Sequence, residues 1–147
     1  MADQFAIVCA QFYSDLAERL TAGAQAALAD EGFDAAQCFE VAGAFELPLA
    51  AKLCAKTGLY AGVICLGAVI RGETDHYDYV CAESARGIGA VALETGVPCS
   101  FGVLTVETME QALERSGGGT RDSGRNAAEA VIALARVNKQ LDGLSGA

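Results

Sequence analysis

The sequence predicts an α/β fold in which helices cover both faces of a four-stranded parallel sheet. Four apolar runs, each short enough to be a buried strand, alternate with stretches whose apolar residues recur at helical spacing. Strands that alternate with helices are joined by crossovers, and crossovers produce parallel pairing. The longest run, 59–70, stops at Arg71 and enters a polar turn ahead of a helix. Open α/β sheets place their binding sites at such strand ends.

Turn and capping residues delimit the first three strand–helix units. Ser14 is expected to cap the first helix, which carries leucine and alanine at helical spacing until Gly32. Pro48 suits the first turn of the second helix, and Gly96 with Pro98 closes the third. The predicted strands are 5–11, 38–43 and 60–70, and the predicted helices are 14–32, 48–58 and 77–95.

The fourth predicted strand, 99–104, is followed by two further helices. Thr105 is expected to cap the first of them. Its inner face is expected to consist of Val106, Met109 and Leu113. The segment 116–124 (SGGGTRDSG) then interrupts the helical pattern. The last helix carries one apolar stripe, formed by Ala127, Val131, Leu134 and Leu141.

Composition and charge bound the class of protein. The 147 residues suit a single domain with its own core. The 10 basic residues against 19 acidic ones give a net charge of −9, which argues against nucleic acid and anionic membranes as partners. The longest apolar run is too short for a bilayer, which takes about 20 residues, and the N-terminus lacks a signal-peptide pattern. The six cysteines form no C-x-x-C pair, so we expect reduced thiols in a soluble, cytoplasmic protein.

Chain segments with chemically useful side chains follow the predicted strands, and parallel strands gather their carboxyl ends at one edge. The segment 12–13 supplies an aromatic ring, and 43–46 supplies a carboxylate beside small residues. The segment 68–76 contains a Gly-Glu-Thr turn and the only histidine, His76, while 105–107 follows the last strand. Together these groups can stack a flat ring, bind hydroxyls, hold an anion and move a proton.

His76 and Glu46 each admit two interpretations. A lone histidine at a helix start more often hydrogen-bonds to backbone than it catalyses. This one follows a buried strand and a turn whose free N–H groups can face an anion, which favours proton transfer. Glu46 can be a solvated carboxylate, but its place between Phe45 and Leu47 favours a carboxylate that meets donors such as a polyol. Phe12, like Phe101 of the fourth strand, can equally be a core residue.

Two arginines near the strand ends are expected to differ. Arg71 is either part of the site or in a structural ion pair with a nearby acid: Glu73, Asp75 or Asp78. Arg115 ends a helix that runs antiparallel to the strands, so on one subunit we expect it at the opposite edge of the sheet from His76. It joins the site only if a neighbouring subunit supplies it; otherwise it is a last-turn cation favoured by the helix dipole.

Other chemistries are less favoured by the sequence. A Cys–His nucleophile requires Cys81 to face His76, and five positions apart on a helix they point in different directions. No phosphate-binding glycine loop of the dinucleotide or Walker type follows a strand. Acids at a helix start are more often solvated dipole partners than metal ligands. That argument applies to the possible metal cluster Glu73, Asp75, His76 and Asp78.

Three segments closely resemble the lumazine synthase family: VAGAFELP at 41–48, LGAVIRGETDHYDYV at 66–80, and FGVLTVETMEQALER at 101–115. The resemblance implies a flavodoxin-like three-layer sandwich that assembles as a homopentamer with active sites between subunits. It also implies a transferase that condenses 5-amino-6-(ribitylamino)uracil with 3,4-dihydroxy-2-butanone 4-phosphate into 6,7-dimethyl-8-ribityllumazine. This is the penultimate step of riboflavin biosynthesis, and it uses no metal or organic cofactor.

By position, the resemblance implies which residues hold the pyrimidine substrate. Phe12 stacks on its ring, and Glu46 accepts hydrogen bonds from the ribityl hydroxyls. Phe101 of the adjacent subunit closes the ring pocket. The other implied contacts are Ala44 and Phe45 beside the ribityl chain, and Ala68, Val69 and Ile70, whose backbone reads the pyrimidine edge.

The resemblance implies further roles at the phosphate end of the second substrate. Glu73 and Thr74 present backbone N–H groups to the phosphate, and Arg115 of the adjacent subunit clamps it. His76 moves protons during imine formation and phosphate loss. Much of the catalysis is then the positioning of two reactants.

The chain departs from the family pattern at several positions. Members commonly have Asn-Lys-Gly at the start of the last helix, where this chain reads GRNA at 124–127. The phosphate-site lysine is therefore missing, or replaced by Arg121 or Arg125. Tyr13 stands where many members have a small polar residue. The long 116–124 loop favours a free pentamer or a pair of pentamers over an icosahedral shell.

Two alternative functions compete with lumazine formation. An archaeal-type riboflavin synthase shares the structural lineage, but the complete GAFELP and RGETDH motifs disfavour it. A non-catalytic oligomer that binds lumazine or flavin is favoured only by the altered start of the last helix. The presence of His76, Glu46 and Arg115 disfavours that second alternative.

Overall fold

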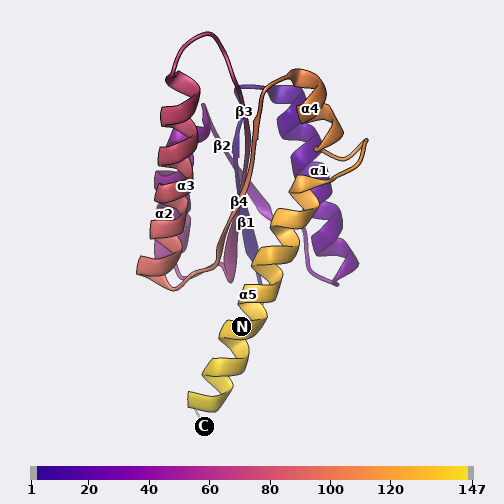
Figure 1. The fold of residues 1–147 in the computed structure, drawn as a ribbon. Coiled ribbons are helices and arrows are strands. Elements are labelled where there is room, and N and C mark those ends of the chain that lie inside the picture. Colours follow the sequence, from indigo (N-terminus) through magenta and orange to yellow (C-terminus); the bar gives the residue numbers. More distant parts are fainter. Residues whose placement is uncertain (1–2, 146–147) are drawn as a thin grey trace.

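The computed structural model describes residues 3–145 and confirms the predicted α/β fold (Figure 1). One parallel sheet has the strand order β2-β1-β3-β4, so β1 and β3 are central and β2 and β4 are edge strands. The strand bounds are β1 Phe5–Ala10, β2 Gln37–Val41, β3 Gly62–Ile70 and β4 Cys99–Val106.

Helices cover both faces of this sheet, which makes the protein a flavodoxin-like three-layer sandwich (Figure 1). None of the helices within residues 3–145 combines the length and the apolarity needed to cross a bilayer. One face carries α1 (Ser14–Asp30), α4 (Met109–Glu114) and α5 (Ser123–Ser145); the other carries the 3-10 turn η1 (Ala44–Glu46), α2 (Leu47–Lys56) and α3 (His76–Thr95).

Alternate residues of the central strands enter two separate cores. Every residue of β1 is buried, because the strand is covered on both faces and paired on both edges. Ile7 and Ile64 belong to the core beneath α1 and α5, whereas Val8 and Val63 belong to the core beneath α2 and α3. Near-continuous apolar runs are typical of parallel strands that are buried on both faces.

Glycines end three helices where the sequence predicts them to end. Gly96 caps α3 with a φ of 74°, and Gly32 and Gly58 follow α1 and α2 with φ values of 85° and 72°. Side chains with a Cβ are strained in this left-handed region, so glycine is the residue that permits the turn. Pro48 lies in the first turn of α2, also as predicted.

Two predicted helix caps are wrong. Ser14 is the first residue of α1, and Tyr13 occupies the capping position without a side-chain hydrogen bond. Thr105 lies inside β4, because pairing of β4 with β3 continues to Val106 and overrides the local capping signal. The cap of α4 is Thr108, whose hydroxyl accepts a hydrogen bond from the Gln111 N–H at 3.1 Å.

The predicted inner faces of the last two helices are only partly right. Ala112 is the buried residue of α4, while Met109 and Leu113 are exposed. In α5, Ala127 and Val131 are buried, but Leu134 and Leu141 are at least half exposed. Figure 1 shows the reason, since the second half of α5 projects past the end of the sheet. Within residues 3–145, no other element covers the apolar side chains Leu134 and Leu141 enough to bury them.

The close contact of β4 with β3 and α5 predicts the effect of a single added methyl group. A Cβ on Gly102 would lie 2.7 Å from the Ala127 Cβ and 2.9 Å from the Cys65 carbonyl oxygen. Backbone cannot move aside easily, so Gly102→Ala is expected to lower the free energy of unfolding by about 1–3 kcal/mol.

Gly89 provides the matched control, because a Cβ there meets nothing within 4 Å. Gly89 lies in the middle of α3, so Gly89→Ala is expected to leave stability unchanged or raise it by about 0.5–1 kcal/mol. Urea unfolding at one fixed protein concentration measures both changes. Equal midpoints for Gly102→Ala and the unmodified protein would show that β4 is not packed as closely as described.

Candidate active site

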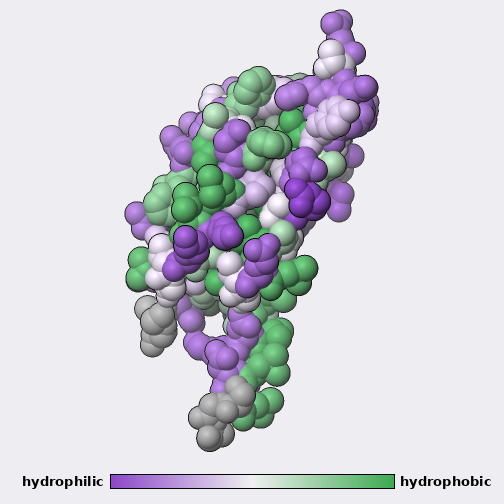
Figure 2. Space-filling model, turned by 90° about the vertical axis from the view of Figure 1, so that its left-hand side faces the viewer, coloured by the Kyte–Doolittle hydropathy of each residue, from purple (hydrophilic) through white to green (hydrophobic). Residues whose placement is uncertain are grey.

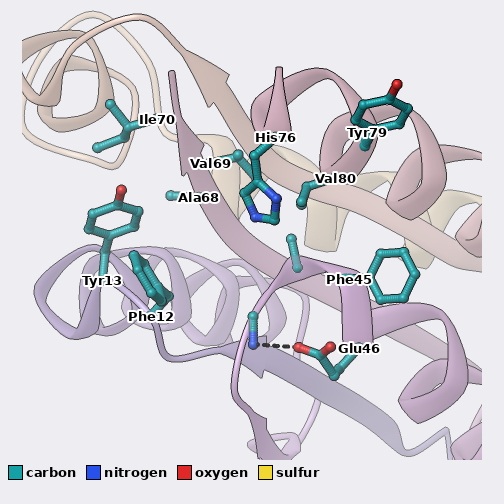
Figure 3. A pocket seen from close by; sticks show the side chains of 12 residues that line it. Phe12, Tyr13, Phe45, Glu46, Ala68, Val69, Ile70, His76, Tyr79 and Val80 are labelled. Atoms are coloured by element: carbon teal, nitrogen blue, oxygen red, sulfur yellow. Dashed lines mark hydrogen bonds between the residues drawn. The ribbon is translucent and has the colours of Figure 1, made fainter. Parts of the chain in front are cut away.

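A pocket of about 480 Å³ opens at the carboxyl edge of the sheet (Figure 3). Its walls come from the turn after β1, the connection between β2 and α2, the end of β3 and the first turns of α3. Segments distant in the sequence therefore meet at one place, as the sequence predicts. The lining residues are Phe12, Tyr13, Gly43, Ala44, Phe45, Glu46, Ala68, Val69, Ile70, His76, Tyr79 and Val80.

The end of β3 forms the floor of this pocket, because β3 extends further than its neighbour β1. β1 pairs with β3 only as far as Leu66, whereas β4 pairs with β3 up to Ile70. From Ala68 onwards, β3 therefore has a partner on the β4 side and an open backbone edge on the pocket side. Backbone N–H and C=O groups on an open edge are available to a planar ligand that carries donors and acceptors.

Phe12 and Tyr13 form an aromatic wall immediately after β1. Their ring centroids are 4.9 Å apart and their planes are inclined by 80°. Phe12 is 74% exposed, so it is not the core residue that its apolar side chain permits. An exposed aromatic ring at a pocket wall can stack against a flat ligand.

Glu46 is held in place by the backbone of the same turn. Its Oε1 accepts a hydrogen bond from the Gly43 N–H at 2.9 Å, and the Glu46 N–H donates to the Gly43 carbonyl at 3.2 Å (Figure 3). The side chain is exposed at the pocket mouth. The reciprocal bonds fix the carboxylate and leave Oε2 to accept a hydrogen bond from a ligand hydroxyl.

His76 is the first residue of α3, and its imidazole lies in the pocket near Val69 and Val80 (Figure 3). The His76 N–H lies 3.4 Å from the Thr74 hydroxyl, which ties the start of the helix to the preceding turn. The imidazole is exposed and beside the open N-terminal end of a 20-residue helix. Free N–H groups at a helix start favour an anion, so an acid–base group and an anion site adjoin here.

Arg71 is a structural residue rather than a pocket residue. Its Nε lies 3.0 Å from Glu107 Oε2, its Nη2 lies 3.3 Å from Asp78, and its guanidinium lies 4.2 Å from the Tyr77 ring centre. The hydrogen bond to Glu107 raises the pKa of Arg71. The predicted pairing with Asp78 is confirmed, whereas Glu107 was not anticipated because it follows the neighbouring strand.

Four of the predicted site residues do not line the pocket. Glu73 and Thr74 are exposed in the turn just before His76. Phe101 is 40% exposed on the edge strand β4. Arg115 donates from Nη1 to the Gln111 carbonyl at 3.0 Å, at the end of α4.

The expected position of Arg115 is wrong in one respect. The six residues of α4 rise only about 9 Å, so Arg115 does not reach the opposite edge of the sheet. The helix lies instead near the carboxyl edge (Figure 1). Arg115 nevertheless remains outside the pocket lining of its own chain.

Tyr79 and Val80 were missed as lining residues, although their spacing from His76 could have indicated them. Residues at positions i, i+3 and i+4 share one helix face, so the face that carries His76 also carries these two. Gly43 and Tyr13 belong to the segments 43–46 and 12–13, which the sequence placed at this edge. The sequence assigned neither of them a contact with a ligand.

Neither the cysteines nor the acidic groups of residues 3–145 form an alternative reactive centre. The Cys81 thiol lies against Tyr77 rather than His76, and burial raises its pKa. A thiol with a raised pKa is a weak nucleophile. Within the part of the chain that the structure describes, no group of three or more His, Cys, Asp and Glu side chains is placed to hold a metal ion.

A parallel sheet covered on both faces, with a ligand-sized pocket at its carboxyl edge, defines an α/β protein of flavodoxin-like architecture. The 6,7-dimethyl-8-ribityllumazine synthase family model matches residues 3–139, nearly the whole chain. The chain therefore belongs to the 6,7-dimethyl-8-ribityllumazine synthase family. This is a family of transferases, and membership supports lumazine synthase activity in riboflavin biosynthesis.

The thiol environments predict which cysteine reacts first. Burial raises the pKa of Cys99 to about 11 and also raises the pKa of Cys9 and Cys65, so at pH 8 these thiols stay protonated. Cys38 is exposed. Iodoacetamide at pH 8 is therefore expected to label Cys38 first in the native protein, as read by peptide mass spectrometry. Equally fast labelling of Cys65 would contradict the described burial, and labelling in urea serves as the control.

Proposed function

We propose that this protein condenses 5-amino-6-(ribitylamino)uracil with 3,4-dihydroxy-2-butanone 4-phosphate, releasing 6,7-dimethyl-8-ribityllumazine, phosphate and water. The single observation that carries the proposal is the convergence of Phe12, Glu46 and His76 around the open edge of β3. A stacking ring, a fixed carboxylate, an imidazole and free backbone groups match the parts of these two substrates.

The aminouracil substrate is proposed to lie along the open edge of β3. Its pyrimidine ring stacks on Phe12, while its ring carbonyl and N–H groups pair with the backbone of 68–70. The ribityl chain follows the segment Ala44–Glu46, where Glu46 Oε2 accepts from the hydroxyls. Oε1 is already held by Gly43, so the carboxylate meets the ligand in one orientation. Pre-orientation of this kind lowers the entropic cost of binding.

The butanone phosphate is proposed to place its phosphate at the turn 72–75, with backbone N–H groups of Glu73 and Thr74 as donors. These two residues adjoin His76 at the start of α3. The 5-amino group attacks the ketone, water leaves and an imine forms, and phosphate is then eliminated. The ribitylamino nitrogen closes the ring by attack on the remaining carbonyl carbon, and a second water leaves. Each step moves a proton near the reacting carbon, and His76 is the acid–base group of the pocket.

A neighbouring copy of the chain is proposed to complete the site with Phe101 and Arg115. Exposed apolar side chains occur on two different sides of the molecule, on α2 and α3 and along the outer end of α5. Figure 2 shows apolar side chains on both regions. A contact between two different surfaces repeats head to tail and forms a ring where the rotation between neighbours closes. The ring proposed for this protein is a homopentamer. The contributing residues are Leu49, Leu53 and Leu93 on one side and Leu134, Val137 and Leu141 on the other.

Arg121 is the better candidate for a second phosphate-site cation. The Arg125 guanidinium pairs with Asp30 of α1 at 2.8 Å and lies 3.7 Å from Glu129 of its own helix. The pair with Asp30 directs the Arg125 side chain towards α1. Arg121 takes part in none of the ion pairs formed among residues 3–145. Its N–H donates to the Glu114 carbonyl at 3.1 Å, which keeps it beside Arg115.

Product formation tests the proposed reaction directly. The two substrates are mixed with purified protein, and lumazine absorbance and phosphate release are followed against the uncatalysed background. Stoichiometric lumazine and phosphate above background support the proposal. Ligand binding with a background rate would identify a non-catalytic binding protein, and riboflavin formed from lumazine alone would identify a riboflavin synthase.

Substitution of the imidazole is expected to slow the chemical step. His76→Ala should lower kcat by tenfold or more, about 1.4 kcal/mol of barrier, with a smaller change in KM. Glu83→Gln on the same helix is the control, because Glu83 pairs with Arg86 away from the pocket. An unchanged kcat in His76→Ala would remove the imidazole from the mechanism.

Arg115 is expected to act on the phosphate substrate across a subunit boundary. Arg115→Ala should raise KM for the butanone phosphate, because a charge-assisted hydrogen bond is lost. Co-assembly of His76→Ala chains with Arg115→Ala chains should restore part of the activity, since some mixed interfaces carry both intact groups. Activity that stays at the level of the two separate variants would place both groups in one subunit's site.

A further inference from the structure

Tyr13 is held in the pocket by its backbone and by its ring. It occupies the capping position of α1 with φ −111° and ψ 88°, and its carbonyl accepts from the Ala17 N–H at 2.9 Å. One side of its ring packs against the core beneath α1 and α5, and the Phe12 ring meets it at 80°. A side chain fixed in this way loses little conformational freedom when a ligand arrives.

The hydroxyl of this fixed ring has no partner within the described residues 3–145. It points towards Ala68 and Ile70, where β3 has left its pairing with β1 (Figure 3). A half-buried phenol normally hydrogen-bonds through its O–H. The Tyr13 hydroxyl is thus an unused donor beside the unused backbone edge of β3.

We propose that Tyr13 determines specificity for the flat ring of the substrate, by donating its phenolic hydrogen to a carbonyl oxygen at the ring edge. The inference deepens the proposed function and rests on it for the identity of the ring. It assigns to Tyr13 a positioning task that is separate from stacking by Phe12 and from proton transfer by His76.

The arrangement of the pocket decides which part of a ligand Tyr13 meets. Tyr13, Phe12 and the end of β3 lie at one end of the pocket, whereas Glu46 and Phe45 lie at the other (Figure 3). A ligand with a polyol at Glu46 therefore presents its ring to Tyr13. A phenol O–H and the N–H groups of an open strand edge both suit carbonyl acceptors, so the ring that fits is a dione such as a pyrimidinedione.

Removal of one oxygen atom tests the assignment. Tyr13→Phe keeps the ring, its packing and its contact with Phe12, so folding is preserved. Binding of two probes is measured by fluorescence titration: 6,7-dimethyl-8-ribityllumazine, and 6,7-dimethyllumazine, which has the same ring carbonyls but no ribityl chain. Tyr13→Phe is expected to weaken both probes about five- to tenfold, the loss typical of one hydrogen bond.

Two further variants separate the ring from the rest of the ligand. Tyr60→Phe is the matched control, because Tyr60 does not line the pocket and its hydroxyl donates to Gln37 Oε1 at 2.9 Å. The affinity of Tyr60→Phe for both probes should be unchanged. Glu46→Gln should weaken only the ribityl-bearing probe. In turnover, Tyr13→Phe should raise KM for the aminouracil with little change in kcat and none in KM for the butanone phosphate, as expected for uniform binding of the ring.

The outcomes distinguish this inference from the proposed function. Equal affinity of Tyr13→Phe and the unmodified protein for 6,7-dimethyllumazine overturns the role of the hydroxyl, whatever the turnover. A loss confined to the ribityl-bearing probe also overturns it, because Tyr13 would then meet the side chain. If the unmodified protein binds both probes but forms no lumazine, the proposed reaction is wrong. The affinities of Tyr13→Phe and the unmodified protein for the probes then still test the role of the Tyr13 hydroxyl. If the unmodified protein binds neither probe, both proposals fall.

Discussion

The site depends on one constraint of the sheet, which is that β3 and β4 extend further than β1. Pairing of β1 with β3 stops at Leu66, while β4 follows β3 to Ile70. The step leaves a backbone edge of β3 without a strand partner, and buried backbone groups must be satisfied by something. Residues after the two shorter strands, including Phe12 and Glu46, surround this edge without bonding to it. A ligand can therefore take the place of a missing strand.

The loops around the step are fixed mainly by local hydrogen bonds and ion pairs. Gly43 and Glu46 bond to each other, and Arg71 joins the end of β3 to Glu107 at the end of β4. Exposed ion pairs contribute little stability, so we assign these contacts a positioning role. The Arg71–Glu107 pair links the end of β3, which lines the pocket, to the segment that leads into α4 and Arg115.

Sequence reasoning predicted the element order and the parallel sheet because each rests on local signals. Apolar runs, helical spacing and the glycines at 32, 58 and 96 mark their elements directly. It failed where a long-range contact competes with a local signal. Thr105 resembles a helix cap, but the pairing of β4 with β3 keeps it in a strand. Leu134 and Leu141 continue an apolar stripe, but α5 has left the sheet by that point.

The sequence by itself determined which side chains reach the carboxyl edge, since the strand ends and the order of parallel strands follow from pattern and handedness. The sequence pattern therefore indicated Phe12, Glu46, Ala68 and His76 as residues of this edge. Only the tertiary structure decided the step between β1 and β3, the direction of the Tyr13 hydroxyl and the place of α4 near the carboxyl edge of the sheet. These depend on strand register and on packing between distant segments, and a one-dimensional pattern carries neither.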